Sequence, residues 1–235
     1  MTHTNSWFIR WVGIGNLLNL VLFQLLFVVA WMLRPGYSPI RQPASDLGIG
    51  PFGAWVDAGV VVLALLKISL AIAFFIAMRP ILSVAWRWIC AILIALPGVG
   101  NIVTAVFTEA PATLMIHSLA SAVVVLVCLI TLLLVGALLW RTPGWQGFGV
   151  FSVLAGVVFM ALAILLYLTF APTSPLSALH IGGLSERVVI FERDFWYAVV
   201  GWHLYKQASG AGVHPLNQRG RPLSERREST AGWTC

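Results

Sequence analysis

Residues 113–140 have the sequence TLMIHSLASAVVVLVCLITLLLVGALLW, a run of 28 residues with no charged side chain. A helix needs about 20 apolar residues to cross the hydrocarbon core of a bilayer. The whole chain of 235 residues is 60% hydrophobic and 9% charged, whereas a soluble domain has about 45–50% apolar and about 25% charged residues. The composition therefore excludes a soluble enzyme, a disordered chain and a collagen-like fibre, and it predicts an integral membrane protein.

Four further stretches are long and apolar enough to cross a membrane as helices. They are, roughly, residues 11–33, 54–78, 84–107 and 148–171. The repetition of such runs, each bounded by shorter polar segments, is typical of a polytopic helix bundle.

A sixth stretch, roughly 184–205, is less clear because charged residues interrupt it: Glu186, Arg187, Glu192, Arg193 and Asp194. It either crosses the membrane inside the bundle or lies on the membrane surface as an amphipathic helix. We favour the crossing, because a distinctly basic segment follows it. The prediction is an all-α bundle of six transmembrane helices within residues 1–206, followed by a basic tail, 207–235, that lacks periodicity and is expected to be disordered.

The distribution of basic residues predicts the orientation. Nine of the fourteen Lys and Arg residues lie in the N-terminal segment, the 79–87 and 141–147 turns, the tail and Lys206 just before it, and four lie in the alternate segments. Cytoplasmic loops carry the excess of Lys and Arg. We therefore expect a multi-pass protein of the cell inner or plasma membrane, with both termini in the cytoplasm. This prediction depends on the tail, which supplies four of the nine.

The net charge of +6 follows this topology and lacks the alternation of Arg with aromatic residues that is typical of a nucleic-acid surface. Membrane lipids are therefore the expected partners and nucleic acid is not. The oligomeric state does not follow from the sequence.

Polar side chains concentrate in the three predicted loops on the side opposite the tail. The candidate ligand-binding residues there are Ser45, Asp46, Glu109, His117, His180, Glu186 and Arg187. Helix bundles commonly bind ligands between facing helices. His117 is the strongest candidate, because an ionisable residue one turn inside an apolar helix often has a function and needs a partner. Asp46 or Glu109 is the expected partner.

Structural roles remain open for the same residues. Ser45 and Asp46 can cap a short helix, and Glu109 can stabilise the N-terminus of the following helix. Arg187 can bond to a loop carboxylate. A histidine that holds a loop by one hydrogen bond is as good an explanation of His117 as a catalytic one.

Metal and hydrolase sites have weak support. His117, His180, Asp46 and Glu109 are acceptable zinc ligands, but no pair of histidines has the usual spacing. We expect no metal and no cofactor, with zinc as a weak possibility. A serine hydrolase would use Ser45, Ser118, Ser121 or Ser185, and the sequence has no G-x-S-x-G motif.

Lys67 lies near the middle of the second predicted span. A charge there is costly unless it is paired. Asp194 or Glu192 of the last helix lies at a comparable depth, so we predict that Lys67 forms a buried ion pair with one of them. This pair would draw the charged last helix into the bundle.

Three motifs together resemble a known family. They are YSPIRQPASDLG (37–48), the acid–proline turn Glu109-Ala110-Pro111 followed by His117, and GLSERV (183–188). In this order they resemble the six-span bacterial membrane proteins grouped as domain of unknown function 998, over about residues 7–205. The resemblance implies a six-helix fold and an outward-facing polar cluster, and it implies no activity.

Two hypotheses of function follow, and whether the protein is an enzyme stays open between them. In the first, the protein binds or moves a lipid or another small hydrophobic molecule at the polar cluster on the extracytoplasmic side. In the second, it is a membrane-embedded lipid hydrolase or transferase, with His117 as general base and Asp46 or Glu109 orienting it.

Overall fold

The computed structural model describes residues 3–210, and all regular structure in that range is helical. The elements in chain order are α1 (His3–Met32), η1 (Ser45–Gly48), α2 (Gly53–Ala77), α3 (Val84–Val106), α4 (Leu114–Trp140), α5 (Gln146–Phe170), η2 (Pro175–Leu179) and α6 (Gly182–Ala208). The all-α prediction is confirmed for these residues. Residues 211–235, which make up most of the predicted tail, lie outside the described residues.

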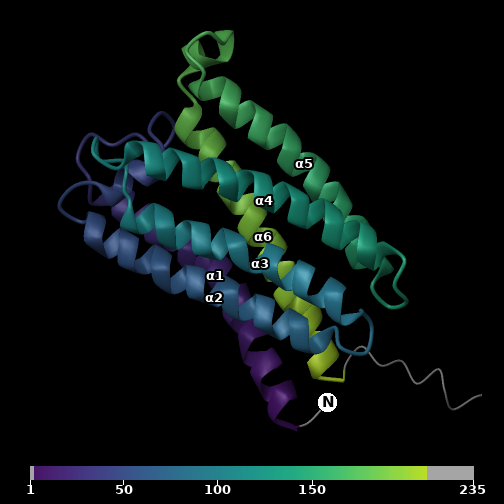
Figure 1. The fold of residues 1–235 in the computed structure, drawn as a ribbon. Helices are drawn as coiled ribbons and strands as arrows, with labels where there is room; N and C mark the ends of the chain where they lie inside the picture. The colour runs from purple at the N-terminus through teal and green to yellow at the C-terminus, as the bar shows by residue number, and fades with distance from the viewer. Residues whose placement is uncertain (1–2, 211–235) are drawn as a thin grey trace, which may run out of the picture.

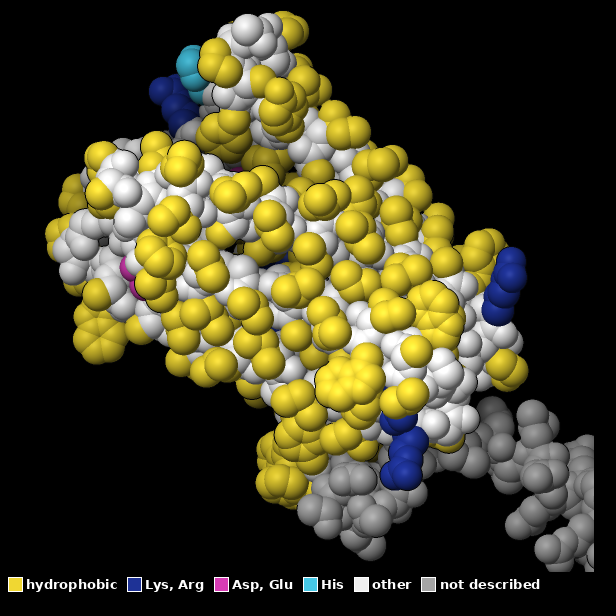
Figure 2. Space-filling view, in the orientation of Figure 1, with side chains coloured by type: hydrophobic (Ala, Val, Ile, Leu, Met, Phe, Trp, Pro, Cys, Tyr) yellow, Lys and Arg dark blue, Asp and Glu magenta, His cyan; other side chains and the backbone are white. Residues whose placement is uncertain are grey.

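Five of these helices have the length and composition of membrane spans, α1 to α5. Their outward side chains are apolar, and hydrophobic atoms cover most of the face seen in Figure 2, while Lys and Arg appear towards the two ends of the molecule. This arrangement is that of a multi-pass membrane protein, as the composition predicted. α6 does not meet the same composition criterion, because five charged residues lie within its first half.

The six α-helices form a closed ring. Each α-helix packs against its neighbours in sequence, and α6 returns to pack against α1 and α2 as well as α5. In Figure 1 the start of α1 and the end of α6 lie at the same end of the bundle, and the loops that carry η1 and η2 lie at the other. We call the second end the loop end. Towards the end of the bundle that holds the termini, the interior is filled by a hydrophobic core that includes Phe74, Ile94, Leu132 and Trp196.

Pro97 interrupts the hydrogen bonding of α3 without ending the helix. Proline has no N–H, so the carbonyl four residues earlier, that of Leu93, loses its helical partner. Thr131 of α4 donates to this oxygen (3.1 Å). Tyr197 of α6 donates to the next carbonyl, that of Ile94 (2.6 Å). The carbonyl that the proline frees and the one that follows it thus both accept bonds from neighbouring helices, in a region where water is scarce.

Glycines allow α1 and α6 to approach closely. A Cβ atom added to Gly13 would lie 2.6 Å from the carbonyl oxygen of Gly201, and one added to Gly201 would lie 2.9 Å from that of Gly13. The ring is closed at this contact between backbones, and small residues are common at such membrane helix interfaces.

We predict that Gly13→Ala lowers the stability of the purified protein by about 1–3 kcal/mol, because the added methyl group forces α1 away from α6. Gly147→Ala is the control, since a Cβ atom there meets open space. Thermal unfolding in detergent measures both variants. Equal melting temperatures would contradict the close contact.

Candidate functional site

A cavity of about 150 Å³ lies inside the ring near the loop end, and side chains from all six α-helices line it. Most of its wall is apolar and includes Phe23, Val124 and Phe159. Polar side chains gather at two places. One set, which we call the mouth, lies at the loop end; the other, the floor, lies deeper and includes Asn101 and Arg193.

The loop between α1 and α2 covers the mouth, and Arg187 of α6 holds it in place. The Arg187 guanidinium donates to the carbonyl oxygens of Pro39 (2.8 Å) and Gln42 (3.0 Å) and to the hydroxyl of Tyr37. Burial raises the pKa of Tyr37 above its usual value, so this hydroxyl stays neutral; it also donates to Pro43 O (2.6 Å). The expectation that Arg187 bonds to a loop carboxylate was wrong: its hydrogen-bond partners are backbone carbonyl groups and the Tyr37 hydroxyl.

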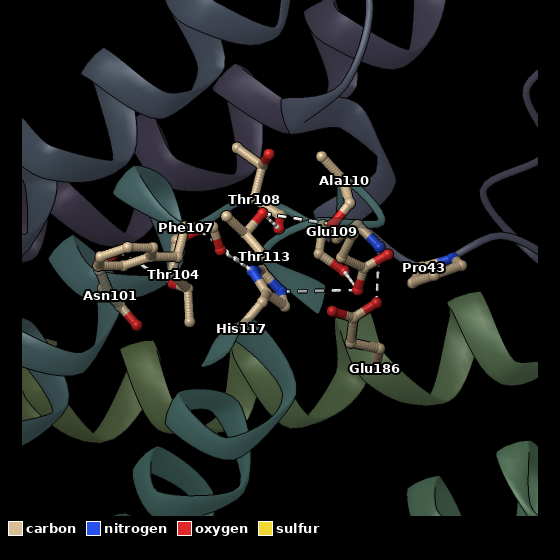
Figure 3. Close-up of polar contacts among 12 residues, drawn as sticks. Pro43, Asn101, Thr104, Phe107, Thr108, Glu109, Ala110, Thr113, His117 and Glu186 are labelled. Atoms are coloured by element: carbon tan, nitrogen blue, oxygen red, sulfur yellow. Dashed lines mark hydrogen bonds and ion pairs between the residues drawn. The ribbon is translucent and has the colours of Figure 1, made fainter. Parts of the chain in front are cut away.

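Ser45, Glu109 and His117 meet at the mouth. Ser45 Oγ donates to Glu109 Oε1 (2.6 Å), and His117 Nε2 lies 3.5 Å from the same oxygen. His117 Nδ1 lies 2.8 Å from Phe107 O and 3.1 Å from Thr104 O, as Figure 3 shows. Because both neighbours are acceptors, Nδ1 carries the hydrogen. The histidine thus ties the start of α4 to the end of α3.

Further carboxyl groups surround this cluster. Glu186 of α6 accepts a hydrogen bond from the backbone N–H of Ala44 (2.6 Å) and lines the cavity together with Asp57. Asp46 lies in η1, where burial and the nearby Glu109 carboxyl raise its pKa to about 6, against the opposing effect of Arg34. The mouth is therefore rich in acidic groups, and Asp46 takes up a proton at a higher pH than an ordinary aspartate does.

Two earlier hypotheses do not match this geometry. Ser45 does not cap η1 through its side chain, because the N-cap position is Ala44 and no side-chain hydrogen bond closes it. Nor do Ser45 and His117 form a nucleophile–base pair, since the Ser45 hydroxyl donates to Glu109. A serine nucleophile would require the histidine as its acceptor.

His180 lies apart from the cluster. It is exposed at the end of η2, with φ of 50°. Over residues 3–210, no group of three or more His, Cys, Asp or Glu side chains is arranged to hold a metal ion. The structure thus brings together Ser45, Glu109, His117 and Glu186, places Asp46 beside them and leaves His180 out.

Two buried charges, Lys67 and Asp194, lie directly behind the cavity lining at the floor, and we count them as part of it. Lys67 Nζ lies 2.7 Å from Asp194 Oδ1, and Arg193 Nε lies 3.1 Å from the same oxygen. The ring of Phe23 lies 4.7 Å from Lys67 Nζ, as a cation–π contact. The structure therefore pairs Lys67 with Asp194 and not with Glu192, whose Oε2 is buried without a hydrogen-bond partner in the described part of the chain.

Three residues of the site were not singled out from the sequence: Asp57, Asn101 and Arg193. Asp57 lies in the second turn of α2 and lines the cavity. Arg193 was noted only as one of the charges in the sixth stretch, although it directly precedes Asp194. Asn101 follows the Pro97 turn of α3 and faces the same interior.

A family model described as "Protein of unknown function (DUF998)" matches residues 17–203. No curated protein and no solved structure matches the chain. The matched region contains the mouth and the floor and extends from within α1 to near the end of α6.

We predict that Asp194→Asn destabilises the protein by about 3–5 kcal/mol, because it leaves Lys67 and Arg193 buried without a counter-charge. Lys67→Met is expected to cost less, since Asp194 keeps Arg193 as a partner. Glu192→Gln on the same helix is the control and should leave stability unchanged. Yield and melting temperature in detergent measure the three variants; a loss with Glu192→Gln as large as with Asp194→Asn would contradict this account.

Proposed function

The chain belongs to the DUF998 family, whose function is unknown, and we propose that it is a six-span membrane protein that binds and moves a small lipid-like or other hydrophobic molecule through its central cavity. The observation that carries the proposal is the cavity itself, an apolar chamber between a polar mouth and a charged floor. Ligand sites are commonly apolar pockets with a few convergent polar groups.

The volume of the cavity limits the size of the ligand. A cavity of about 150 Å³ is comparable with engineered cavities that hold a single aromatic ring. A phospholipid with two acyl chains is far larger. The ligand is therefore a small amphipathic molecule, or one end of a longer one.

The buried charges inside the bundle support a function for the cavity. Lys67 and Asp194 are 0% and 1% exposed at their side chains. Ionisable residues inside a membrane bundle are costly and often mark the path of a substrate or ion. A bundle needed only as a scaffold could fill the same space with apolar side chains at lower cost.

The proposal includes a sixth crossing. α6 has 27 residues, about 40 Å at 1.5 Å per residue, which is enough for a bilayer core about 30 Å thick. Its charges at positions 193 and 194 are buried against the other helices and not exposed to lipid. Both termini then lie on one side, which the basic residues indicate is the cytoplasm of a plasma or inner membrane.

We do not take the hydrolase or transferase hypothesis as the proposed function. The contact of His117 Nε2 with Glu109, at 3.5 Å, is long, and Nδ1 is occupied by two backbone carbonyls. These contacts support a histidine that holds the mouth in shape. A small-molecule binding role needs no chemistry from it.

We predict that Ala105→Phe abolishes ligand binding, because the ring fills the cavity that Ala105 lines. Ala85→Phe, at an exposed position near the other end of α3, is the control. Native mass spectrometry of the full-length proteins should show a small bound molecule on the wild type and the control, and none on Ala105→Phe. The same bound mass on all three would refute the proposal.

Single cysteines test the topology in a variant whose native cysteines are replaced by serine. Arg41→Cys, His180→Cys and Arg141→Cys lie at exposed loop positions. We expect a membrane-impermeant maleimide to label the first two in intact cells and to label Arg141→Cys only after permeabilisation. Labelling of positions 41 and 180 from opposite sides would exclude six crossings.

A further inference from the structure

We propose that the ligand carries a single carboxylate, which binds to the guanidinium of Arg193 at the floor of the cavity. This inference rests on the proposed function and adds the chemical class of the ligand. It follows from the charges of the floor, from the free hydrogen-bond donors there and from the composition of the wall.

The ion-paired side chains of the floor carry an excess positive charge. Lys67 and Arg193 share one carboxylate, and both contact the same oxygen of Asp194. Glu192 is close enough to Arg193 to interact with it electrostatically, but it forms no ion pair within residues 3–210. Glu186 is seven residues before Arg193, about 10 Å along the helix, and belongs to the mouth. A buried cation without a counter-charge is unfavourable, so an anion from outside the chain would complete the floor.

Arg193 is the cation that faces the cavity. Lys67 is fully buried between Asp194 and the Phe23 ring and does not line the cavity, whereas Arg193 does. The Arg193 Nε hydrogen is used by Asp194, and Nη1 has only a long contact with Asn101 Oδ1 (3.4 Å). Nη2 has no hydrogen-bond partner in the described part of the chain.

The orientation of the Asn101 amide also indicates that the terminal nitrogens of Arg193 lack acceptors. With the amide turned over, its oxygen accepts from Lys67 Nζ (3.2 Å) and its nitrogen donates to Pro97 O (3.3 Å). The Asn101 amide is then satisfied by its neighbours, and both terminal nitrogens of Arg193 are left without an acceptor. Two parallel N–H donors of a guanidinium match the two oxygens of a carboxylate.

The rest of the cavity wall indicates what the remainder of the ligand, apart from its carboxylate, is like. Phe23, Val124 and Phe159 offer apolar contact between floor and mouth, so the body is a ring or a short alkyl chain. Asp57 and Glu186 lie in the wall at the mouth, where a second anionic group would be repelled. The structure thus favours a monocarboxylate over a dicarboxylate.

Four small probes of similar size test the charge: benzoate, benzamide, benzylamine and terephthalate. We expect isothermal titration with the full-length protein in detergent to show that benzoate binds at least about tenfold more tightly than the other three. Ala105→Phe, which fills the cavity, should bind none of them.

Arg193→Gln tests the residue. It leaves the Lys67–Asp194 pair intact and removes the excess charge, so the fold is expected to survive while the preference for benzoate over benzamide disappears. Arg193→Lys keeps the positive charge but lacks the two parallel N–H donors of the guanidinium, and it should bind benzoate with intermediate affinity. If Arg193→Gln does not fold, the benzoate affinity of Arg193→Lys tests the role of Arg193 instead. Arg141→Gln, at an exposed site, is the matched control and should bind benzoate as the wild type does.

The outcomes separate the two proposals. Equal binding of benzoate and benzamide, or an unchanged benzoate affinity in Arg193→Gln, overturns the carboxylate and leaves the cavity function standing. If no probe binds while native mass spectrometry still distinguishes the wild type from Ala105→Phe, the ligand class is also wrong. If that distinction is absent too, the proposed function itself fails.

Discussion

The carboxylate of Asp194 is the interaction on which the ring of helices depends. It lies almost completely buried and contacts Lys67 of α2 and Arg193 of its own helix through one oxygen. Without it, α2 and α6 would bring two positive charges into an interior where the desolvation of each ion costs several kcal/mol. With it, a helix that carries five charges in its first half can occupy a place between α1 and α5 and close the bundle.

A related requirement, that backbone polar groups be satisfied within the protein, explains the other cross-links. Pro97 frees one carbonyl of α3, and Thr131 of α4 donates to it. At the loop end, Arg187 donates to the carbonyls of a loop that has no regular structure to use them. Backbone groups within a membrane protein are satisfied internally, and here side chains from neighbouring helices supply the donors. The cavity lies between these two cross-linked regions, the Pro97 turn of α3 and the loop that Arg187 holds.

The sequence predicts α1 to α5 well, because the length of each apolar run is enough to identify them. The choice of Asp194 over Glu192 could also have been made from helical periodicity. Asp194, Tyr197 and Gly201 fall at intervals of three and four residues and share one face, whereas Glu192 lies about 200° away from Asp194 around the helix. Tyr197 and Gly201 are both buried, which identifies that face as the inner one. The mouth could not be predicted in the same way. The contact of Ser45 with Glu109 joins two separate loops, and the path of each loop depends on tertiary hydrogen bonds that no local pattern specifies.

Arg193 is the residue that packing alone does not account for. Lys67 and Asp194 by themselves form a neutral pair that joins α2 to α6, and a neutral side chain at position 193 would leave that pair undisturbed. Helix α6 instead places a second cation, Arg193, beside this pair. Arg193 is 7% exposed and lies in the wall of a mostly apolar cavity. Burial of an extra charge lowers stability, and the ion pair of Arg193 is with Asp194 on the same helix. Its contacts with other helices are a long one with Asn101 Oδ1 (3.4 Å) and a distant cation–π contact with Phe23 (5.9 Å). A group that weakens the empty protein and directs hydrogen-bond donors into a cavity is explained by a ligand that accepts them.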